Sequence, residues 1–335
     1  MSDLVIGASL RGLPVIAPAG YDVGKPLPSS PPSWQTRPSM RRVLLLAFVW
    51  GWSFVFIKIA GRGFNATTVA AGRVACGLIT LLIVGRLSRV RMPRDRRFWW
   101  NATLSGVLGA ALPFTLLAWA EQHISSALTS VAQATTTIFA AIASAIVMRD
   151  RLRVSQVVGL GVGIVGVAIA SGLDFGEVGS ASALGVLAAI VAGLWYALNY
   201  VHIQRNLIQV PPIVAATGQL AMATIVLAPI ALVTSIFSGT HATPGRIGAV
   251  LELGVVATGI AYWINYGTIG RLGATRAALT TYLIPPVAIV VGWLVLNERV
   301  DLRLVVGTAI IIGGVAAVHG GRHTMPSPAV EARSR

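Results

Sequence analysis

Ten long apolar segments, each long enough to cross a bilayer, constrain the fold of this chain more than any other feature. A membrane-spanning helix needs about 20 consecutive apolar residues, and helices satisfy their own backbone hydrogen bonds inside lipid. Short polar connections separate the segments. The sequence therefore predicts an all-α polytopic membrane protein with ten transmembrane helices. The segments cover residues 43–61, 67–85, 98–119, 124–148, 154–171, 183–203, 211–237, 247–269, 275–296 and 302–319.

Prolines lie inside several of these segments, at Pro113, Pro229 and the pair Pro285–Pro286. Proline removes a backbone donor and frees a carbonyl. Bilayer helices tolerate it where neighbouring groups bind that carbonyl. We therefore expect kinks beside a cavity at these positions.

The composition of the chain excludes a water-soluble fold. Hydrophobic residues make up 55% of the chain and charged residues only 11%, whereas about 25% of the residues in soluble domains are charged. So few charges cannot cover so much apolar surface in water. We therefore expect the lipid bilayer to surround most of the chain.

The distribution of positive charge predicts the orientation of the chain. A net charge of +15 would suggest a nucleic-acid partner in a soluble protein. With the N-terminus in the cytoplasm and ten alternating spans, however, 20 of the 26 Lys and Arg residues fall on the cytoplasmic side. Cytoplasmic loops of membrane proteins carry this excess. We therefore expect both termini in the cytoplasm, a location in the cytoplasmic (inner) membrane and no nucleic-acid partner.

The two ends of the chain differ from its middle. Residues 1–40 contain a stretch rich in Pro and Ser that cannot form a core, which predicts a disordered cytoplasmic tail. Met40 directly precedes Arg41–Arg42 and is an alternative start, in which case residues 1–39 follow from a misplaced start codon. Residues 320–335 are expected to form a second cytoplasmic tail.

An internal repeat divides the middle of the chain. The stretch at 148–170, MRDRLRVSQVVGLGVGIVGVAIA, aligns with LNERVDLRLVVGTAIIIGGVAAV at 296–318, which lies 148 residues later. Each copy then holds five spans, an odd number, so the second copy would be inverted relative to the first. Inverted repeats are common in secondary transporters. We therefore expect five-helix repeats at 41–172 and 183–319, although a chance match between Gly- and Val-rich helices remains an alternative.

Several stretches resemble a known transporter family. They are VWGWSFVFIKIA at 49–60, Arg73 in the second span, and ALTTYLIPPVAIVVGWLVLNERV at 278–300 before a last helix that contains glycine. The chain resembles the ten-helix EamA-type transporters of the drug/metabolite transporter superfamily over residues 43–319. The first repeat departs from the pattern, since Thr137 and Asp150 stand opposite Pro285 and Glu298.

Neither a cofactor nor an enzymatic site is indicated. Gly161, Gly163 and Gly166 match the dinucleotide-binding G-x-G-x-x-G, but that motif works only after a strand. Here Gly159 and Gly163 indicate a face for close helix packing. The lone Cys76 and five scattered histidines suggest no metal site. An intramembrane enzyme, which needs a nucleophile–base set or a metal cluster, is therefore a remote alternative.

Polar and aromatic side chains inside the spans are the candidates for a central substrate pathway. A buried amide needs a hydrogen-bond partner or water, whereas a tryptophan can also serve in packing or in an interfacial belt. A cavity lined by amides and aromatic rings would suit amphipathic or zwitterionic small molecules. The candidates are Trp50, Ser53, Trp119, Gln133, Trp195, Asn199, Gln219, Tyr262, Asn265 and Tyr282.

Three ionisable residues fall at a similar predicted depth, in the outer third of the bilayer. They are Lys58, Arg73 and Glu252. Charged side chains inside spans usually pair or mark a transport pathway, although Lys58 could also extend to the interface. We expect the three to form a charged cluster at the outer mouth of the cavity.

The sequence thus predicts a secondary transporter that works by alternating access. The resemblance implies export of small metabolites, such as amino acids or related amphipathic compounds. Efflux of drugs and toxic compounds, or uptake by the same fold, are alternatives. A small-molecule substrate and the bilayer are the expected partners, and a homodimer is an open possibility for assembly.

Overall fold

The computed structural model describes residues 40–147, 154–172, 180–238, 240–272, 280–281 and 283–320. Throughout this part of the chain the regular structure is helical, without a strand. Most of both predicted tails, Asp150 and Tyr282 lie outside the described residues.

The helices overlap the predicted segments, and most spans begin or end where the apolar pattern meets polar residues. Those that match the predicted spans in the first part of the chain are α1 (Met40–Gly61), α2 (Ala66–Leu87), α3 (Arg96–Gly106), α4 (Leu112–His123), α5 (Ser126–Gln133), α6 (Thr136–Val147) and α7 (Val154–Ser171). Those in the second part are α8 (Ala181–Asn206), α9 (Pro212–Ser238), α10 (Pro244–Gly254), α11 (Ala261–Leu272), α13 (Ile284–Leu296) and α14 (Leu302–Gly320). In both parts, π-helical turns, η2 (Val107–Ala111) and η4 (Val255–Ile260), join two α-helices into one span.

Polar side chains fix the N-termini of several helices. The first N–H groups of a helix lack partners within it, and Ser, Thr, Asn and Asp side chains accept from them. Asn65 caps α2, Ser125 caps α5 and Ser180 caps α8 in this way. Asp95 and Thr243 do the same for α3 and α10.

Seven stretches are long and apolar enough to cross a membrane, and three further apolar helices are shorter. The chain is therefore a multi-pass membrane protein, although the expected ten full-length spans are not all present as single helices. Pro285 and Pro286 occupy the first positions of α13. This helix, Ile284–Leu296, has 13 residues and a length of about 20 Å at 1.5 Å per residue, less than the predicted 275–296.

The outward faces of the helices are apolar. Ile225, Ile236 and Phe237 on α9 are 64%, 73% and 83% exposed, and Trp293 and Leu294 on α13 are 57% and 63% exposed. Soluble monomers rarely expose such large apolar surfaces. These faces are suited to contact with lipid.

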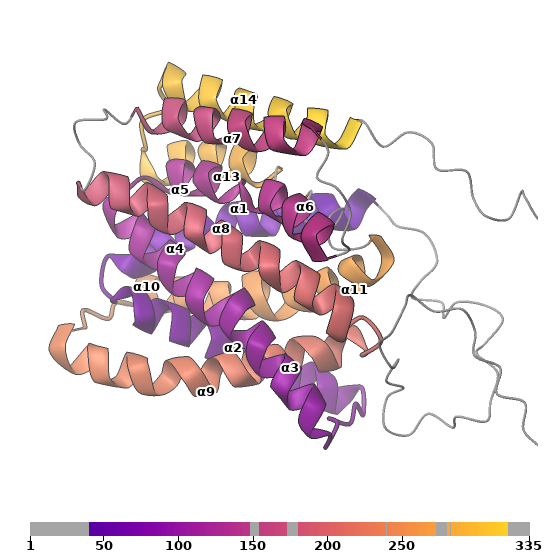
Figure 1. Ribbon diagram of the computed structural model, residues 1–335. Helices are drawn as coiled ribbons and strands as arrows, with labels where there is room; N and C mark the ends of the chain where they lie inside the picture. Colours follow the sequence, from indigo (N-terminus) through magenta and orange to yellow (C-terminus); the bar gives the residue numbers. More distant parts are fainter. Residues whose placement is uncertain are drawn as a thin grey trace, which may run out of the picture.

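The bundle interleaves helices from the two parts of the chain (Figure 1). Helix α2 packs against α9, α1 against α13, and α8 against both α4 and α6. Figure 1 shows α7 and α14 side by side at one edge of the bundle and α9 at the opposite edge. The buried core therefore lies between helices that are distant in the sequence.

Glycines allow α7 and α14 to pack very closely. A Cβ on Gly166 would lie 2.9 Å from the carbonyl oxygen of Gly307, and one on Gly314 would lie 2.6 Å from Val162. Residues later in α7 thus face residues earlier in α14, so the two helices run antiparallel. This confirms the predicted packing role for the glycine-rich helix, although Gly163 faces Ile138 of α6 instead.

Candidate functional site

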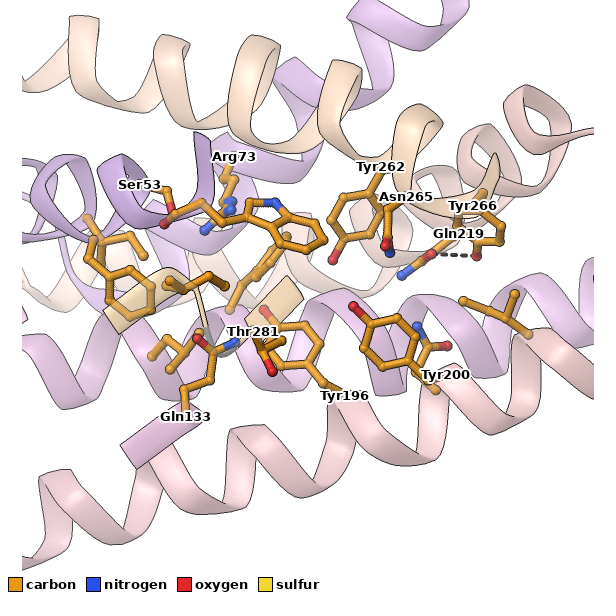
Figure 2. A pocket seen from close by; sticks show the side chains of 18 residues that line it. Ser53, Arg73, Gln133, Tyr196, Tyr200, Gln219, Tyr262, Asn265, Tyr266 and Thr281 are labelled. Carbon is orange, nitrogen blue, oxygen red and sulfur yellow. Dashed lines mark hydrogen bonds between the residues drawn. The ribbon is translucent and has the colours of Figure 1, made fainter. Parts of the chain in front are cut away.

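A pocket lies in the middle of the bundle, between α1, α2, α4, α5, α8, α9, α11 and α13 (Figure 2). It has an empty volume of about 620 Å³, counting the part continuous with solvent. Its walls are formed by Trp50, Ser53, Phe54, Ile57, Arg73, Phe114, Leu117, Gln133, Tyr196, Asn199, Tyr200, Ile203, Gln219, Tyr262, Asn265, Tyr266, Thr281 and Ile284.

Helical periodicity explains why α8 contributes four residues to this wall. Tyr196, Asn199, Tyr200 and Ile203 recur at intervals of three and four residues, so they share one face of the helix. Tyr262, on α11, faces them across the pocket in Figure 2. Aromatic rings and amides therefore line both sides of the cavity.

The π-helical turn η2 frees a backbone carbonyl, which is bound by a residue of the pocket wall. In an α-helix the carbonyl of Gly109 would accept from the N–H of residue 113, but Pro113 has no N–H. The N–H of Leu112 instead reaches back to Val107. The hydroxyl of Tyr262 donates to the freed carbonyl of Gly109 at 2.5 Å. A side chain from the second part of the chain thus satisfies the carbonyl that the irregular turn frees in the first part.

The π-helical turn η4 frees the corresponding carbonyl without a proline. The N–H of Ala261 donates to the carbonyls of Val256 and Thr258 and passes over the one between them. That carbonyl, of Ala257, accepts the indole N–H of Trp50 at 3.0 Å. Here a side chain from the first part of the chain satisfies the carbonyl that the irregular turn frees in the second part.

Arg73 brings a positive charge to the wall of the pocket. Its side chain is only 4% exposed. Its Nε donates to the hydroxyl of Thr258 at 2.7 Å and its Nη2 to the carbonyl of Ala257 at 3.4 Å. The guanidinium also lies 3.9 Å from the ring centroid of Phe114, a favourable cation–π arrangement. These partners orient the guanidinium, and none of them carries a negative charge.

A hydrogen-bonded network joins α3, α8, α9 and α11 beside the pocket. The hydroxyl of Ser105 donates to the amide oxygen of Asn199 at 2.8 Å and lies 3.0 Å from the hydroxyl of Tyr266. Tyr266 in turn donates to the amide oxygen of Gln219 at 2.5 Å (Figure 2). The Nε2 of Gln219 has no partner. This amide can therefore donate to a bound molecule if the side chain turns toward the cavity.

Beyond the pocket, charged groups hold the connection between α4 and α5. We call Lys58, Glu121 and Glu298 the charged layer. The ammonium of Lys58 donates to the backbone carbonyls of Glu121 and, at 2.7 Å, of Ile124. The end of a helix leaves such carbonyls without intrahelical partners, and lysine is a suitable donor for them.

Glu298 acts on the opposite end of the same connection. Its carboxylate accepts from the backbone N–H of Ser126 at 2.9 Å, from the hydroxyl of Ser126 at 2.8 Å and from the N–H of Ala127 at 3.2 Å. A carboxylate at a helix N-terminus is stabilised by both hydrogen bonds and the helix dipole. Residues from α1 and from the segment after α13 thus fix the α4–α5 connection at the end of the pocket.

The family model for the EamA-like transporter family matches the chain twice, over residues 42–172 and 183–319. The chain belongs to the EamA-like transporter family. A transporter moves its substrate without changing it, so this membership implies a protein that is not an enzyme.

Curated relatives of this EamA-like transporter cover most of its length. An "Uncharacterized transporter YvbV" from Bacillus subtilis is 27% identical over 84% of this chain and 92% of its own. A "Probable terminal-alkyne amino-acid exporter" from Streptantibioticus cattleyicolor is 25% identical over 83% of this chain and 92% of its own. The relatives support a transport function.

A solved crystal structure of a protein has a similar fold. Its TM-score is 0.59 at 19% sequence identity, and the match covers 84% of this chain and 97% of the other. At this identity the likeness concerns the fold alone.

Most of the expected pathway residues of the transporter lie in the wall of its pocket. The structure places Trp50, Ser53, Arg73, Gln133, Asn199, Gln219, Tyr262 and Asn265 there. Trp119 instead stacks on His123, with the ring centroids 4.1 Å apart, and Trp195 is half-buried on another face of α8. Tyr282 lies outside the described residues, although the adjacent Thr281 lines the pocket.

The three residues expected to form one charged cluster have different surroundings. Lys58 is bound to the carbonyls at the end of α4 and neither lines the pocket nor bonds Arg73 or Glu252. Arg73 lies within electrostatic range of Glu252. Glu252 is half-buried, and its Oε2 has no hydrogen-bond partner. The structure therefore brings Arg73 and Glu252 near each other, whereas Lys58 has its own site.

Sequence reasoning missed several residues of the wall and the roles of the two carboxylates of the charged layer. Tyr196 lies three residues before Asn199, Tyr200 lies four after Tyr196, and Tyr266 lies four after Tyr262, so helical spacing could have found all three. Glu121 and Glu298 were not identified as central, because each gains its role from contacts between distant helices.

The described residues contain no group of three or more His, Cys, Asp or Glu side chains that could hold a metal ion. The polar groups that face the pocket are amides, hydroxyls and one guanidinium. These groups can recognise a carboxylate and an apolar or cationic remainder by hydrogen bonding and stacking.

Proposed function

We propose that this transporter exports small amphipathic carboxylates, including amino acids and related compounds, by alternating access. The observation that carries the proposal is Arg73, a buried guanidinium in the pocket wall whose hydrogen-bond partners are uncharged. A buried charge is costly unless it is paired. Glu252 lies within electrostatic range but makes no hydrogen bond to this guanidinium, so a substrate carboxylate would be its first hydrogen-bonded anion.

The rest of the wall suits the remainder of such a substrate. Tyr196, Tyr200 and Tyr262 offer aromatic faces that can pack against an apolar side chain or receive an ammonium group. Asn265 has an amide oxygen without a hydrogen-bond partner, which can accept from an ammonium. A zwitterionic amino acid would thus find groups for both of its charges.

The composition of the wall also weighs against the main alternative, efflux of cationic drugs. Among the described lining residues no Asp or Glu is present to pair with a cation, whereas Arg73 would repel one. The relative from Streptantibioticus cattleyicolor, named as an amino-acid exporter, supports the carboxylate reading. Uptake by the same fold remains the second candidate, since the pocket would serve either direction.

The proposal includes ten spans in two inverted repeats, 41–172 and 183–319, flanked by cytoplasmic tails at 1–40 and 320–335. The two separate matches to the family model support this division. The π-helical turns support it too, since η2 begins at Val107 and η4 begins 148 residues later at Val255. This is the same separation that aligns the two sequence copies.

Helix packing gives further support to an inverted repeat. The contacts are reciprocal at the level of spans: α1 packs against α13 and the span that contains α10 and α11, while α8 packs against α6 and the span that contains α3 and α4. The antiparallel pair α7 and α14 would be the fifth helices of the two repeats. Substrate sites of inverted-repeat transporters lie at the repeat interface, which is where this pocket lies.

We also propose that both termini and the loop at 86–97 face the cytoplasm, with the charged layer on the opposite side. The excess of Lys and Arg in the proposed cytoplasmic segments supports this orientation. Reporter fusions in the 86–97 loop should be active only with a cytoplasmic reporter. An active periplasmic reporter there would contradict both the orientation and the inverted repeats.

Transport of three matched compounds tests the substrate class. Inverted membrane vesicles that contain the protein should accumulate labelled L-leucine and 4-methylpentanoate, which carry a carboxylate, but not leucinamide. Replacing Arg73 by Gln should lower leucine uptake about 10- to 100-fold, because hydrogen bonds to a charged group contribute about 1.5–3 kcal/mol. Uptake into vesicles compared with vector-only vesicles gives the measurement.

Arg86→Gln is the matched control, since Arg86 lies on the same helix and is exposed. It should transport leucine as the wild type does. Equal uptake of leucine and leucinamide, or an Arg73→Gln protein that transports leucine normally, would remove the basis for a carboxylate substrate.

A further inference from the structure

Glu121 is an ionisable side chain buried next to the pocket with no role in substrate contact. It is 1% exposed, and neither of its carboxyl oxygens has a hydrogen-bond partner. It follows the pocket-lining residues Phe114 and Leu117 by two turns and one turn of α4, on the same helix face. Its carboxyl group therefore lies between the pocket and the rest of the charged layer.

The charged neighbours of Glu121 are already engaged elsewhere. The Lys58 ammonium donates to backbone carbonyls at the end of α4. The Glu298 carboxylate accepts from Ser126 and Ala127 at the start of α5. Neither group makes a hydrogen bond to the Glu121 side chain, whose two carboxyl oxygens have no partner.

Three charged groups act on Glu121 from the surrounding helices. They are Lys58 from α1, Arg73 from α2 and Glu298 from the segment after α13. The two cations favour a carboxylate and the neighbouring acid opposes one. None of the three makes a hydrogen bond to the Glu121 side chain.

The other elements that pack against α4 bring no ionisable side chain to this level. Helix α5 and the turn η2 contain none, and α8 contains none between Ala181 and Trp195. On α4 itself, His123 lies two residues away, and its Nδ1 is 2.8 Å from the carbonyl oxygen of Trp119. The charged groups that act on the Glu121 carboxyl are thus the three named above.

We propose that Glu121 is a proton-binding site that couples proton movement to the transport proposed above. A buried carboxylate without donors is unfavourable, whereas a neutral carboxylic acid is tolerated. Glu121 accordingly holds a proton while the charged layer is closed. The proposal rests on the proposed function, because only an alternating transporter opens this layer in its cycle.

Opening of the charged layer favours the ionised form of Glu121 over the neutral acid. Separation of α4 from the segment after α13 would admit water and free the Lys58 ammonium from the end of α4. The carboxylate of Glu121 then pairs with Lys58 in water, and closure of the layer requires that it first bind a proton from the outer side. When the pocket later opens to the cytoplasm, water reaches Glu121 beside it, the O–H bond breaks and the proton leaves on the cytoplasmic side. Each cycle thus carries one proton inward in exchange for the exported substrate.

Infrared spectroscopy tests proton binding without any substrate. The full-length protein in nanodiscs should show a carboxylic-acid carbonyl band at a pH where exposed carboxyl groups are ionised. The band should be lost in Glu121→Gln, shifted in Glu121→Asp and kept in Glu252→Gln. A spectrum without this band, or a band lost only in Glu252→Gln, would overturn the assignment.

A transport measurement tests coupling. In proteoliposomes, an imposed pH gradient should drive uptake of labelled leucine by the wild-type protein and not by Glu121→Gln. The variant should still exchange labelled for unlabelled leucine when no gradient is present. Gradient-driven uptake by Glu121→Gln would overturn the coupling role. A wild-type protein that exchanges no leucine would count against the proposed function, and the infrared result alone would then decide on Glu121.

Discussion

The two π-helical turns, η2 and η4, interrupt their spans in the same way but by different chemistry. In η2, Pro113 removes the N–H that the carbonyl of Gly109 would use. In η4, Ala261 keeps its N–H but donates it to the carbonyls on either side of Ala257. Each freed carbonyl accepts a hydrogen bond from an aromatic side chain of the other part of the chain. Tyr262 donates to Gly109, and Trp50 donates to Ala257.

The difference shows that the proline is not what defines these interruptions. A π-helical turn often marks a functional site, because its extra residue shifts the register and exposes backbone groups. Here a residue of the pocket wall binds a carbonyl of each turn, and one turn forms without proline. Packing with the other half of the molecule is the common factor, and it should therefore matter more than the local sequence.

The largest effects are expected at the glycines just before the two turns. A Cβ on Gly106 would lie 2.8 Å from the carbonyl oxygen of Gln219, and one on Gly254 would lie 3.0 Å from that of Arg73. Both contacts involve the backbone of a neighbouring helix, which cannot move aside easily. Gly106→Ala and Gly254→Ala should each destabilise the protein by about 1–3 kcal/mol, measured as a lower melting temperature in detergent.

Gly248→Ala provides the control for this pair. A Cβ on Gly248 of α10 would meet nothing within 4 Å, so this variant should melt at the wild-type temperature or slightly above, since alanine favours a helix. A large fall in melting temperature for only one of Gly106→Ala and Gly254→Ala would show that the two turns are not held in the same way.

A smaller effect is expected from Pro113→Ala. The new N–H would compete with Tyr262 for the carbonyl of Gly109, but the packing at Gly106 would still hold the turn in place. Stability should change by no more than about 1 kcal/mol, the net contribution of one hydrogen bond. Leucine transport should persist, as measured in vesicles.

Pro229→Ala is the matched control, because Pro229 lies inside α9 and does not line the pocket. Loss of transport in Pro113→Ala alone, with the protein still folded, would show that proline itself is needed in η2. The comparison between the turns would then have to be abandoned.

The positions of the helices could be predicted from the sequence, whereas their interruptions could be predicted only in part. Apolar runs identify spans because lipid imposes length and composition on each helix separately. Pro113 and the prolines of α13 marked two irregular places beside the pocket. Nothing in the local sequence indicated η4, and Pro229 marked no cavity, because these outcomes depend on packing.

The candidate site was predictable to a similar extent. Buried amides such as Asn199 and Gln133 stood out because an amide in lipid needs a partner. Of two adjacent aromatic residues of α8, Tyr196 lines the pocket and Trp195 does not, since one residue along a helix turns the side chain by about 100°. The partners of Lys58 and Glu298 could not be predicted, because both bind backbone groups of distant helices.

The single cysteine of the 335-residue chain has a useful position. Cys76, on α2, is half-buried, and a Cβ on Gly254 would lie next to its own Cβ, so it faces the seam between α2 and α10. The natural protein thus already carries one attachment point for a thiol-reactive fluorophore or spin label, with no other cysteine to remove. Its rate of alkylation would report how often this seam opens during turnover.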